Sequence, residues 1–161
     1  RLLVERGQPD VSSGLQALVR NTAIDTLGLN VGAMHALWTL HGLSLLDGRD
    51  AAALNTALGA LAHPSAGVRR AAIQVVPRTE ASLAVLLARG VLTDPSAQVR
   101  LAALLAVAEM PASDAAGRAV AAALRDPATA GDRWLREAAA AAAARHPAGF
   151  VAGVAETGSP L

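Results

Sequence analysis

Apolar residues spaced three or four positions apart divide this chain into short amphipathic segments. Leu54, Leu58 and Leu61, for example, fall on one face of a helix over residues 50–62. The same spacing predicts further helices over residues 1–6, 10–20, 31–46, 65–76, 80–92, 96–110, 113–124 and 131–145, with a short closing turn at 150–154. Residues 21–30 carry no strong pattern and are predicted to form a longer connection. The fold class predicted is therefore all-α.

Proline and aspartate mark the ends of these segments. Asp94-Pro95 and Asp126-Pro127 each place an acceptor side chain where it can cap a helix N-terminus, with proline at the first helical position. His63-Pro64 keeps the proline but lacks the acidic cap. Proline also follows several apolar runs, where it cannot continue the helix; these residues are Pro77, Pro111 and Pro147.

The chain also repeats itself. The segment His63-Pro-Ser-Ala-Gly-Val-Arg-Arg-Ala-Ala72 returns 31 residues later as Asp94-Pro-Ser-Ala-Gln-Val-Arg-Leu-Ala-Ala103. A fixed period of this size is typical of arrays in which each unit is one supersecondary element stacked on the next. The spacing predicts about four helix pairs, at residues 10–47, 50–77, 79–111 and 113–147, with residues 148–161 as a C-terminal cap or tail.

These motifs resemble the HEAT repeat. Val99-Arg100 before Ala102-Ala103 carries the resemblance, as does Val68-Arg69 before Ala71-Ala72, each near the start of the second helix of a pair. The segment from Asp126-Pro127 to Ala138-Ala139 is a version stretched by about four residues. The resemblance implies a right-handed α-solenoid of about four HEAT-like helix pairs. We therefore expect residues 1–161 to form a single repeat domain, as a fragment of a longer multidomain chain.

A looser resemblance concerns residues 1–7 and 36–43. These segments are similar to the HEAT region of large bacterial extracytoplasmic proteins that join a sugar-dehydrogenase-like β-propeller to a c-type cytochrome. The resemblance implies an extracytoplasmic or periplasmic location and a role as a spacer between redox domains. The chain begins with Arg1 and shows no basic start followed by an apolar core, so it is interpreted as an excised piece without a visible signal peptide.

The composition limits what the core can be made of and which kinds of site the chain can form. The chain is 53% hydrophobic but only 2% aromatic, so its core must come from small side chains with Leu and Val. Alanine and leucine are also the best helix formers. The absence of cysteine excludes a disulfide, a thiolate metal site, a cysteine nucleophile and an attached c-type haem within these residues. The longest uninterrupted candidate for a membrane span, Ala138–Ala144, is far too short.

Charge argues against nucleic acid as a partner. The chain has 14 basic residues, all arginine, against 13 acidic ones, and the arginines are spread evenly. A nucleic-acid-binding domain usually gathers its basic residues on one face.

No Gly-x-Ser-x-Gly elbow, Gly-x-Gly-x-x-Gly loop or Walker-type loop occurs. We therefore expect no independent active site and no cofactor in this segment, although the parent polypeptide could still be an oxidoreductase.

Three arginines recur near the starts of second helices: Arg69, Arg100 and Arg136. In HEAT proteins, matching arginines often pair with an aspartate of the neighbouring unit, so the resemblance implies a ladder with Asp94 and Asp126. His63, standing where an aspartate is expected, would interrupt that ladder. The alternative is a row of guanidiniums that binds an anion through bidentate hydrogen bonds.

His35, Trp38 and His41 form the other candidate group. They lie three residues apart along the predicted helix over 31–46, whose apolar set includes Trp38. Two histidines six apart do not share the helix face that metal ligands need. We expect Trp38 to be buried at a helix-packing or domain interface, and His35 to occupy a polar core or interface position.

The function predicted is a non-catalytic scaffold that mediates protein–protein or interdomain contact. The partner would be a protein or a sister domain of the same polypeptide. The alternative is a HEAT-like nucleic-acid-binding module of the alkylpurine DNA glycosylase type, which would need a basic concave face bearing aromatic residues. A third class, a HEAT-like lyase subunit acting on a bound chromophore, has no residue here that marks its site.

Overall fold

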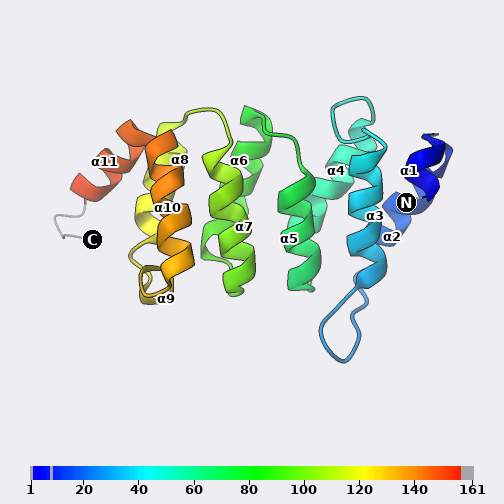
Figure 1. Cartoon of the computed structure of the whole chain (residues 1–161), viewed down its shortest axis with the longest axis horizontal. Helices are drawn as coiled ribbons and strands as arrows, with labels where there is room; N and C mark the ends of the chain where they lie inside the picture. Colours follow the sequence, from blue (N-terminus) through cyan, green and yellow to red (C-terminus); the bar gives the residue numbers. More distant parts are fainter. Residues whose placement is uncertain (1, 8, 157–161) are drawn as a thin grey trace. The chain divides into compact units, whose positions relative to one another are not determined.

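In a computed structural model of the chain, which describes residues 2–7 and 9–156, every regular element is a helix (Figure 1). Within those residues there are eleven α-helices, three short 3-10 helices and no strand. The all-α prediction is confirmed. No helix in this part of the chain combines the length and the apolar character needed to cross a membrane. Of the predicted C-terminal cap or tail at 148–161, residues 157–161 lie outside the described residues.

Contacts between residues divide the chain into two compact units, Arg1–Pro77 and Arg78–Leu161. The division falls between the predicted helix pairs at 50–77 and 79–111. The first unit contains the elements α1 (Leu2–Arg6), η1 (Pro9–Val11), α2 (Ser12–Arg20), α3 (Val31–Gly42), α4 (Ala51–Gly59), η2 (Ala60–Ala62) and α5 (Ala66–Val75).

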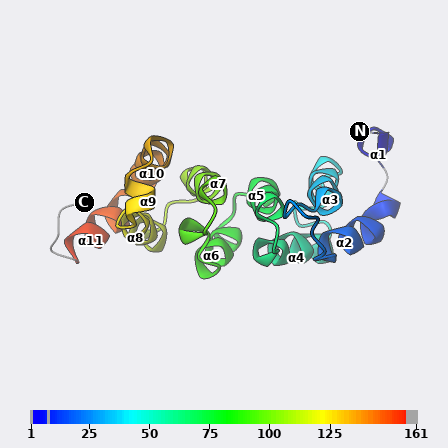
Figure 2. The same ribbon diagram turned by 90° about the horizontal axis from the view of Figure 1, so that it is seen from below.

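The helices of the first unit lie in two layers. Helix α3 packs against both α2 and α5, and α2 also packs against α4. Figure 2 shows α3 and α5 in one layer, with α2 and α4 in the other. Leu37, Leu40 and Ile73 are fully enclosed between the layers, and burying such a side chain contributes about 1.5–3 kcal/mol. Alanines such as Ala33 and Ala57 complete this core and let the helices approach closely.

The second unit is built in the same way from helices and one 3-10 turn. Its elements are α6 (Glu80–Ala88), η3 (Val91–Thr93), α7 (Ala97–Ala108), α8 (Asp114–Ala123), α9 (Pro127–Ala130), α10 (Arg133–Arg145) and α11 (Pro147–Ala155). Helix α7 packs against α10, and α8 packs against α11. Leu104, Met110 and Leu135 fill its core. Only one face of the alanine run is buried, through Ala138, Ala139 and Ala142.

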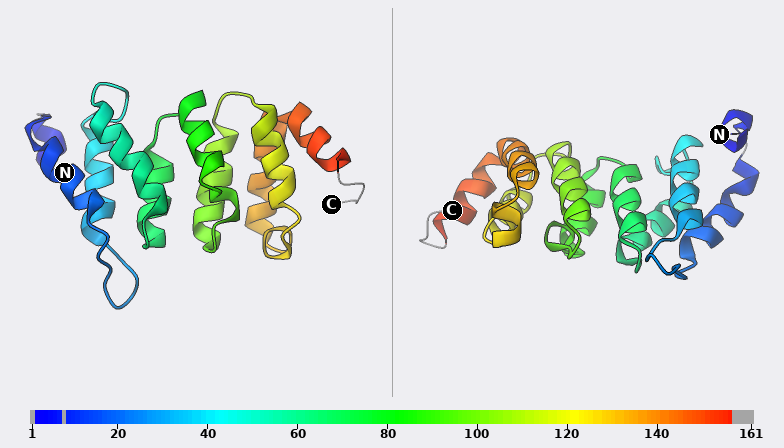
Figure 3. Two further views of the ribbon diagram at one scale, coloured as in Figure 1. Left: turned by 180° about the vertical axis from the view of Figure 1, so that it is seen from behind. Right: turned by 60° about the horizontal axis from the view of Figure 1, so that its bottom comes forward.

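Glycine makes the contact between α8 and α11 unusually close. A Cβ added to Gly117 of α8 would overlap the backbone of His146 and Phe150, and one added to Gly149 of α11 would overlap the backbone of Asp114. Gly153, four residues after Gly149, faces the Cα of Arg118. The left view of Figure 3 shows α11, in red-orange, against α8, in yellow. The two helices therefore meet backbone to backbone.

Two helix ends differ from the prediction. The helix predicted over 31–46 ends at Gly42, because the chain turns at Ser44, whose φ is 55°, and the N–H of Leu45 returns to the carbonyl of Leu40. Leu45 remains buried, but from a turn. The predicted closing turn at 150–154 is a nine-residue helix. Pro147 ends one helix and opens the next, since its missing N–H needs no partner in a first turn.

Of the two Asp-Pro motifs, Asp126-Pro127 caps a helix as predicted and Asp94-Pro95 does not. Helix α7 begins at Ala97 with Ser96 as its N-cap, two residues after Asp94. Asp126-Pro127 does form an N-cap with proline in the first turn, but of the short helix α9. The long helix α10 is capped by Asp132, which accepts hydrogen bonds from two backbone N–H groups. The four inserted residues of this stretched repeat therefore form a helical turn of their own.

Candidate interaction surface and pocket

The three recurring arginines share one local role. Nη1 of Arg69, Arg100 and Arg136 donates to the carbonyl oxygen six residues earlier, at 2.9, 2.8 and 2.8 Å respectively. In each case that carbonyl belongs to the turn or short helix before the arginine's own helix. The guanidinium therefore fastens the preceding segment to the first turns of α5, α7 or α10. Pairing of these arginines with the aspartates of neighbouring helix pairs, as a ladder, stays a prediction.

The turns themselves share a second contact. Asp94 Oδ1 accepts the N–H of Ser96 at 2.9 Å, and Asp126 Oδ1 accepts the N–H of Ala128 at 3.0 Å. His63 does the same with its ring, because Nδ1 accepts the N–H of Ser65 at 3.0 Å. In this turn the imidazole thus replaces a carboxylate as acceptor, a role that the sequence analysis did not foresee.

His63 also connects this turn to the connection between α2 and α3. With Nδ1 acting as the acceptor, the other ring nitrogen, Nε2, donates to the carbonyl of Asn21 at 3.0 Å. The side chain is 4% exposed. His63 therefore anchors the beginning of the segment 21–30 to the end of η2.

The segment 21–30 is an ordered loop that projects beyond the first turn of α3 (Figure 1). Asp25 Oδ1 accepts the N–H groups of Leu27 and Leu29, both at 2.9 Å. Asn30 Nδ2 donates to the carbonyls of Asn21 and Ala23, at 2.7 and 2.9 Å. Its apolar side chains nevertheless face outward, since Leu27 is 79% exposed and Ile24 and Leu29 are about half exposed.

Helix α3, which follows the loop directly, carries further exposed side chains. Val31, His35 and Trp38 follow one another at intervals of four and three, which places them on one face of the helix, and all three are exposed. The expectation that Trp38 is buried is wrong for the first unit taken by itself. Ala33, Leu37 and neighbouring residues form the buried face of α3, and Trp38 is 43% exposed. We call Ile24, Leu27, Leu29, Val31, His35 and Trp38 the loop–α3 surface.

Of the two candidate histidines, His35 belongs to this surface and His41 contacts it through Trp38. The ring of His41 meets that of Trp38 edge to face, with centroids 5.9 Å apart, an arrangement that aromatic rings favour. His35 is exposed and does not occupy a core position. No group of three or more metal-ligating side chains occurs among the residues that the structure describes.

A polar network joins α2 to α4 on the other layer of the first unit. Ser12, Gln16 and Arg20 lie four residues apart on one face of α2. Ser12 Oγ donates to Asp50 Oδ2 at 2.7 Å, and Gln16 Nε2 donates to Ser12 Oγ at 3.0 Å. Arg20 Nη2 donates to Gln16 Oε1 at 2.7 Å and to Thr56 Oγ1 at 2.9 Å. Gln16 and Thr56 are both buried.

Asp50 ends this network and also caps α4. Its Oδ1 accepts the N–H of Ala53 at 2.9 Å. The hydrogen bond from Ala53 and the second one from the Ser12 hydroxyl favour the charged carboxylate, so the pKa of Asp50 lies below its ordinary value. The sequence contains a signal for this network, because Ser12, Gln16 and Arg20 are polar residues spaced four apart. Their partners on α4 depend on how α4 packs against α2.

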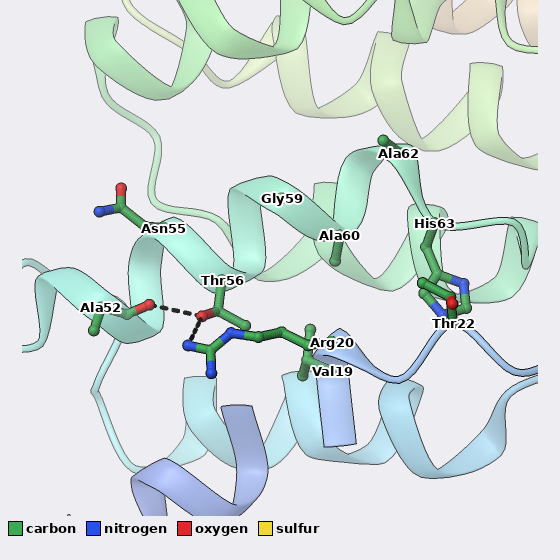
Figure 4. Close-up of a pocket in the computed structure, with 10 residues that line it drawn as sticks. All are labelled: Val19, Arg20, Thr22, Ala52, Asn55, Thr56, Gly59, Ala60, Ala62 and His63. Carbon is green, nitrogen blue, oxygen red and sulfur yellow. Dashed lines mark hydrogen bonds between the residues drawn. The ribbon is translucent and has the colours of Figure 1, made fainter. Parts of the chain in front are cut away.

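The network borders a pocket of about 650 Å³ between α2 and the α4–η2 segment (Figure 4). Val19, Thr22, Gly59 and Ala60 contribute to its lining, with Arg20, Thr56 and His63. Figure 4 shows the guanidinium of Arg20 reaching along α4 to Thr56, while the side chain of Asn55 points away from it.

No protein-family model, curated protein or solved structure matches the chain. The functional argument therefore rests on the residues, the contacts and the pattern of exposure described above.

Proposed function

We propose that this chain is a HEAT-like, right-handed α-solenoid module that binds a protein or a sister domain and does no chemistry of its own. The layered helix pairs support this proposal, as does the turn that recurs around His63, Asp94 and Asp126 with an arginine six residues after each of the first two. Such modules present extended surfaces to partners.

The loop–α3 surface is the single observation that carries the proposed function. Exposed large apolar side chains that lie close together are typical of interaction sites, and Ile24, Leu27, Leu29, Val31 and Trp38 are all exposed within residues 24–38. Trp is also enriched among residues that dominate binding energy, and Trp38 belongs to this surface. Among residues 21–42 the only Asp, Glu, Lys or Arg side chain is that of Asp25, which is acidic and exposed, and this favours a protein partner over nucleic acid.

The order of the loop strengthens this argument. Hydrogen bonds to Asp25 and from Asn30 fix the backbone that carries Leu27 and Leu29. A loop that is already ordered loses less conformational entropy when a partner docks. The resemblance of residues 36–43 makes a sister domain of the same polypeptide the first partner to test.

Site-specific photocrosslinking in the full-length polypeptide tests the proposal. Benzoylphenylalanine would be introduced at Trp38, at Leu27 and, as a matched control, at Leu105, which is 49% exposed but lies outside the loop–α3 surface. We expect crosslinks to one defined domain or protein from Trp38 and Leu27 and none to it from Leu105. Equal crosslinking from all three positions, or none, would contradict the proposal.

The nucleic-acid alternative is tested separately. Binding to a DNA duplex is measured by fluorescence anisotropy at two salt concentrations. We expect no binding at micromolar protein. Salt-sensitive binding with a Kd on the micromolar order or tighter would instead favour the nucleic-acid module.

A further inference from the structure

A pocket of about 460 Å³ lies beside α10 in the second unit, and we call it the α10 pocket. Its size falls in the range of small-molecule sites, which usually have apolar walls and a few polar groups that orient the ligand. Arg136 is the only charged residue in its lining. The other lining residues are apolar: Leu124, Ala130, Ala139, Ala140, Ala143 and Phe150. This composition suits an apolar ligand that carries one charged group.

Small side chains of α10 account for part of this space. Arg69, Arg100 and Arg136 make the same hydrogen bond, so positions counted from them correspond between α5, α7 and α10. The residues four and seven positions after Arg69 and Arg100 are branched aliphatic residues that are at most 2% exposed: Ile73, Val76, Leu104 and Val107. After Arg136 these positions hold Ala140 and Ala143. Branched side chains that fill space in the earlier helix pairs are therefore missing beside α10.

Larger apolar side chains come from the neighbouring helices. Phe150 of α11 and Leu124, the C-cap residue of α8, are both half-buried. Leu124 lies two residues before the recurring turn, and its counterparts Leu61 and Leu92 are each 4% exposed. Helix α10 packs against both α8 and α11, so these side chains and the alanines of α10 line one pocket. A leucine that is covered in the earlier helix pairs therefore remains partly open to a ligand here.

Arg136 offers one whole edge of its guanidinium to a ligand. Its Nη1 donates to the carbonyl of Ala130 at 2.8 Å. Its Nε and Nη2 have no hydrogen-bond or ion-pair partner within the part of the chain that the structure describes. The N–H of Nε and one N–H of Nη2 lie side by side on the same edge, which matches the two oxygens of a carboxylate. Arg136 can therefore bind an anion without giving up its bond to Ala130.

The acidic residues on either side of Arg136 do not occupy this edge. Glu137 pairs with Arg133 at 2.9 Å, and Asp132 caps α10 by accepting two backbone N–H groups. Arg136 is exposed, so a group paired with it stays in contact with water at the mouth of the pocket. One arginine balances one negative charge, which favours a carboxylate over a doubly charged phosphate monoester.

We propose that the α10 pocket binds a monocarboxylate with an aliphatic chain, such as a medium-chain fatty acid. The carboxylate pairs with Nε and Nη2 of Arg136, and the hydrocarbon chain covers Ala140, Ala143 and Phe150. This inference goes beyond the proposed function and uses no residue of the loop–α3 surface. Its failure would leave the proposed function untouched.

The test is a titration of the isotope-labelled chain, followed by ¹H–¹⁵N correlation spectra at constant ionic strength and below the micelle concentration of each probe. The probes are butanoate, hexanoate and octanoate, with octanol as the neutral control and octylammonium as the control of opposite charge. We expect saturable shifts of the amides of Ala140, Ala143 and Phe150 with octanoate. Burying one CH₂ group strengthens binding up to about fourfold, so octanoate should bind at least about tenfold more tightly than butanoate.

The charged group should have a smaller effect than the chain. A solvent-exposed ion pair contributes little, so octanol should bind about two- to fivefold more weakly than octanoate. Octylammonium should bind more weakly than octanol, because its charge has the same sign as that of Arg136.

Three variants locate the site. Arg136→Gln should weaken the binding of octanoate about two- to fivefold and leave that of octanol unchanged. Ala140→Leu gives α10 the side chain that α7 has at this position and fills the pocket, so both ligands should bind at least about tenfold more weakly. Ala141→Leu adds the same side chain at the next residue, which is exposed and outside the lining, and should leave binding unchanged. Thermal unfolding followed by circular dichroism verifies that each variant is folded.

Calorimetric titration of the full-length polypeptide with octanoate shows whether the pocket is open there. We expect the affinity of the isolated chain to be retained. Loss of binding would mean that another segment covers the pocket, and it would overturn the proposal.

Three results with the isolated chain would also overturn it. One is the absence of saturable shifts up to about 10 mM octanoate, where even a weak specific site is partly filled. Another is equal affinity for octanoate and octylammonium, because Arg136 would then not select the carboxylate. The third is a loss in Ala141→Leu as large as that in Ala140→Leu, which would place the ligand outside the α10 pocket.

Discussion

Replacing Gly149 of α11 by alanine tests whether the close contact with α8 holds the end of the second unit together. The new Cβ would overlap the Cα and carbonyl of Asp114, which are backbone atoms and cannot rotate away. Adding a methyl group to a packed contact of this kind costs about 1–3 kcal/mol. Alanine recovers up to about 1 kcal/mol, because glycine is a poor helix former. We expect a net loss of about 1–2 kcal/mol in the free energy of unfolding.

Two further glycine variants should lose less free energy of unfolding than Gly149→Ala. At Gly153 an added Cβ would lie 3.0 Å from Arg118 Cα and 3.1 Å from Ala121 Cβ, a tight fit that a small shift of the helix relieves. At Gly14 of α2 it would meet nothing within 4 Å. Gly153→Ala should therefore cost less than Gly149→Ala, and Gly14→Ala should be neutral or stabilising by about 0.5 kcal/mol.

Urea unfolding followed by circular dichroism measures the three variants, with the midpoint and the slope fitted separately. The reasoning is refuted if Gly149→Ala is as stable as the parent chain, or if Gly14→Ala loses as much as Gly149→Ala. A reduced slope for Gly149→Ala alone would mean that α11 has already detached in the folded state, since the slope follows the surface exposed on unfolding.

Three further predictions concern other contacts. His146→Leu removes the acceptor of the Ser113 N–H, so we expect a loss of about 1–3 kcal/mol in urea unfolding; unchanged stability would show that water replaces the ring. The pKa of Asp50 is lowered in the folded chain, so its contribution to stability is present above the unfolded pKa of about 3.9 and is lost as the pH falls through the folded value. Asp50→Asn should therefore flatten the acid limb of stability against pH, and an unchanged limb would contradict this. Leu37→Ala should cost about 2–5 kcal/mol of stability, whereas Trp38→Ala should change stability by less than about 1 kcal/mol and abolish the crosslinked contact; the reverse pattern would argue that Trp38 is a core residue.

The helix boundaries could be predicted because their signals are local. Leucine spacing and proline positions placed nearly every helix within a few residues. Pro147 was predicted only to end a helix, although proline is also favourable in the first turn of the next helix. The buried face of α3 was partly misassigned, because small residues such as Ala33 carry it and Trp38 is apolar but turned outward. Hydrophobicity alone does not show which of Ala33 and Trp38 is buried.

The contacts between segments could not be read from the sequence in the same way. Gly149 and Gly153 are spaced to lie on one face of a helix, which was a usable signal for close packing, but nothing local names α8 as the partner. Ser12, Gln16 and Arg20 were likewise in register along α2. Their function as a network depends on Asp50 and Thr56, which only the packing of α4 against α2 brings within reach.

His63 connects the two candidate sites, and this limits how they can be separated by experiment. Its ring lines the pocket and holds the carbonyl of Asn21, at the base of the loop that carries Leu27. A substitution at His63 would disturb the anchored loop, the turn before α5 and the pocket wall together, so a loss of binding there would not identify the site responsible. Leu27 and Gly59 each belong to one site only. Variants at these two positions are therefore the ones that assign a bound partner either to the loop–α3 surface or to the pocket of the first unit.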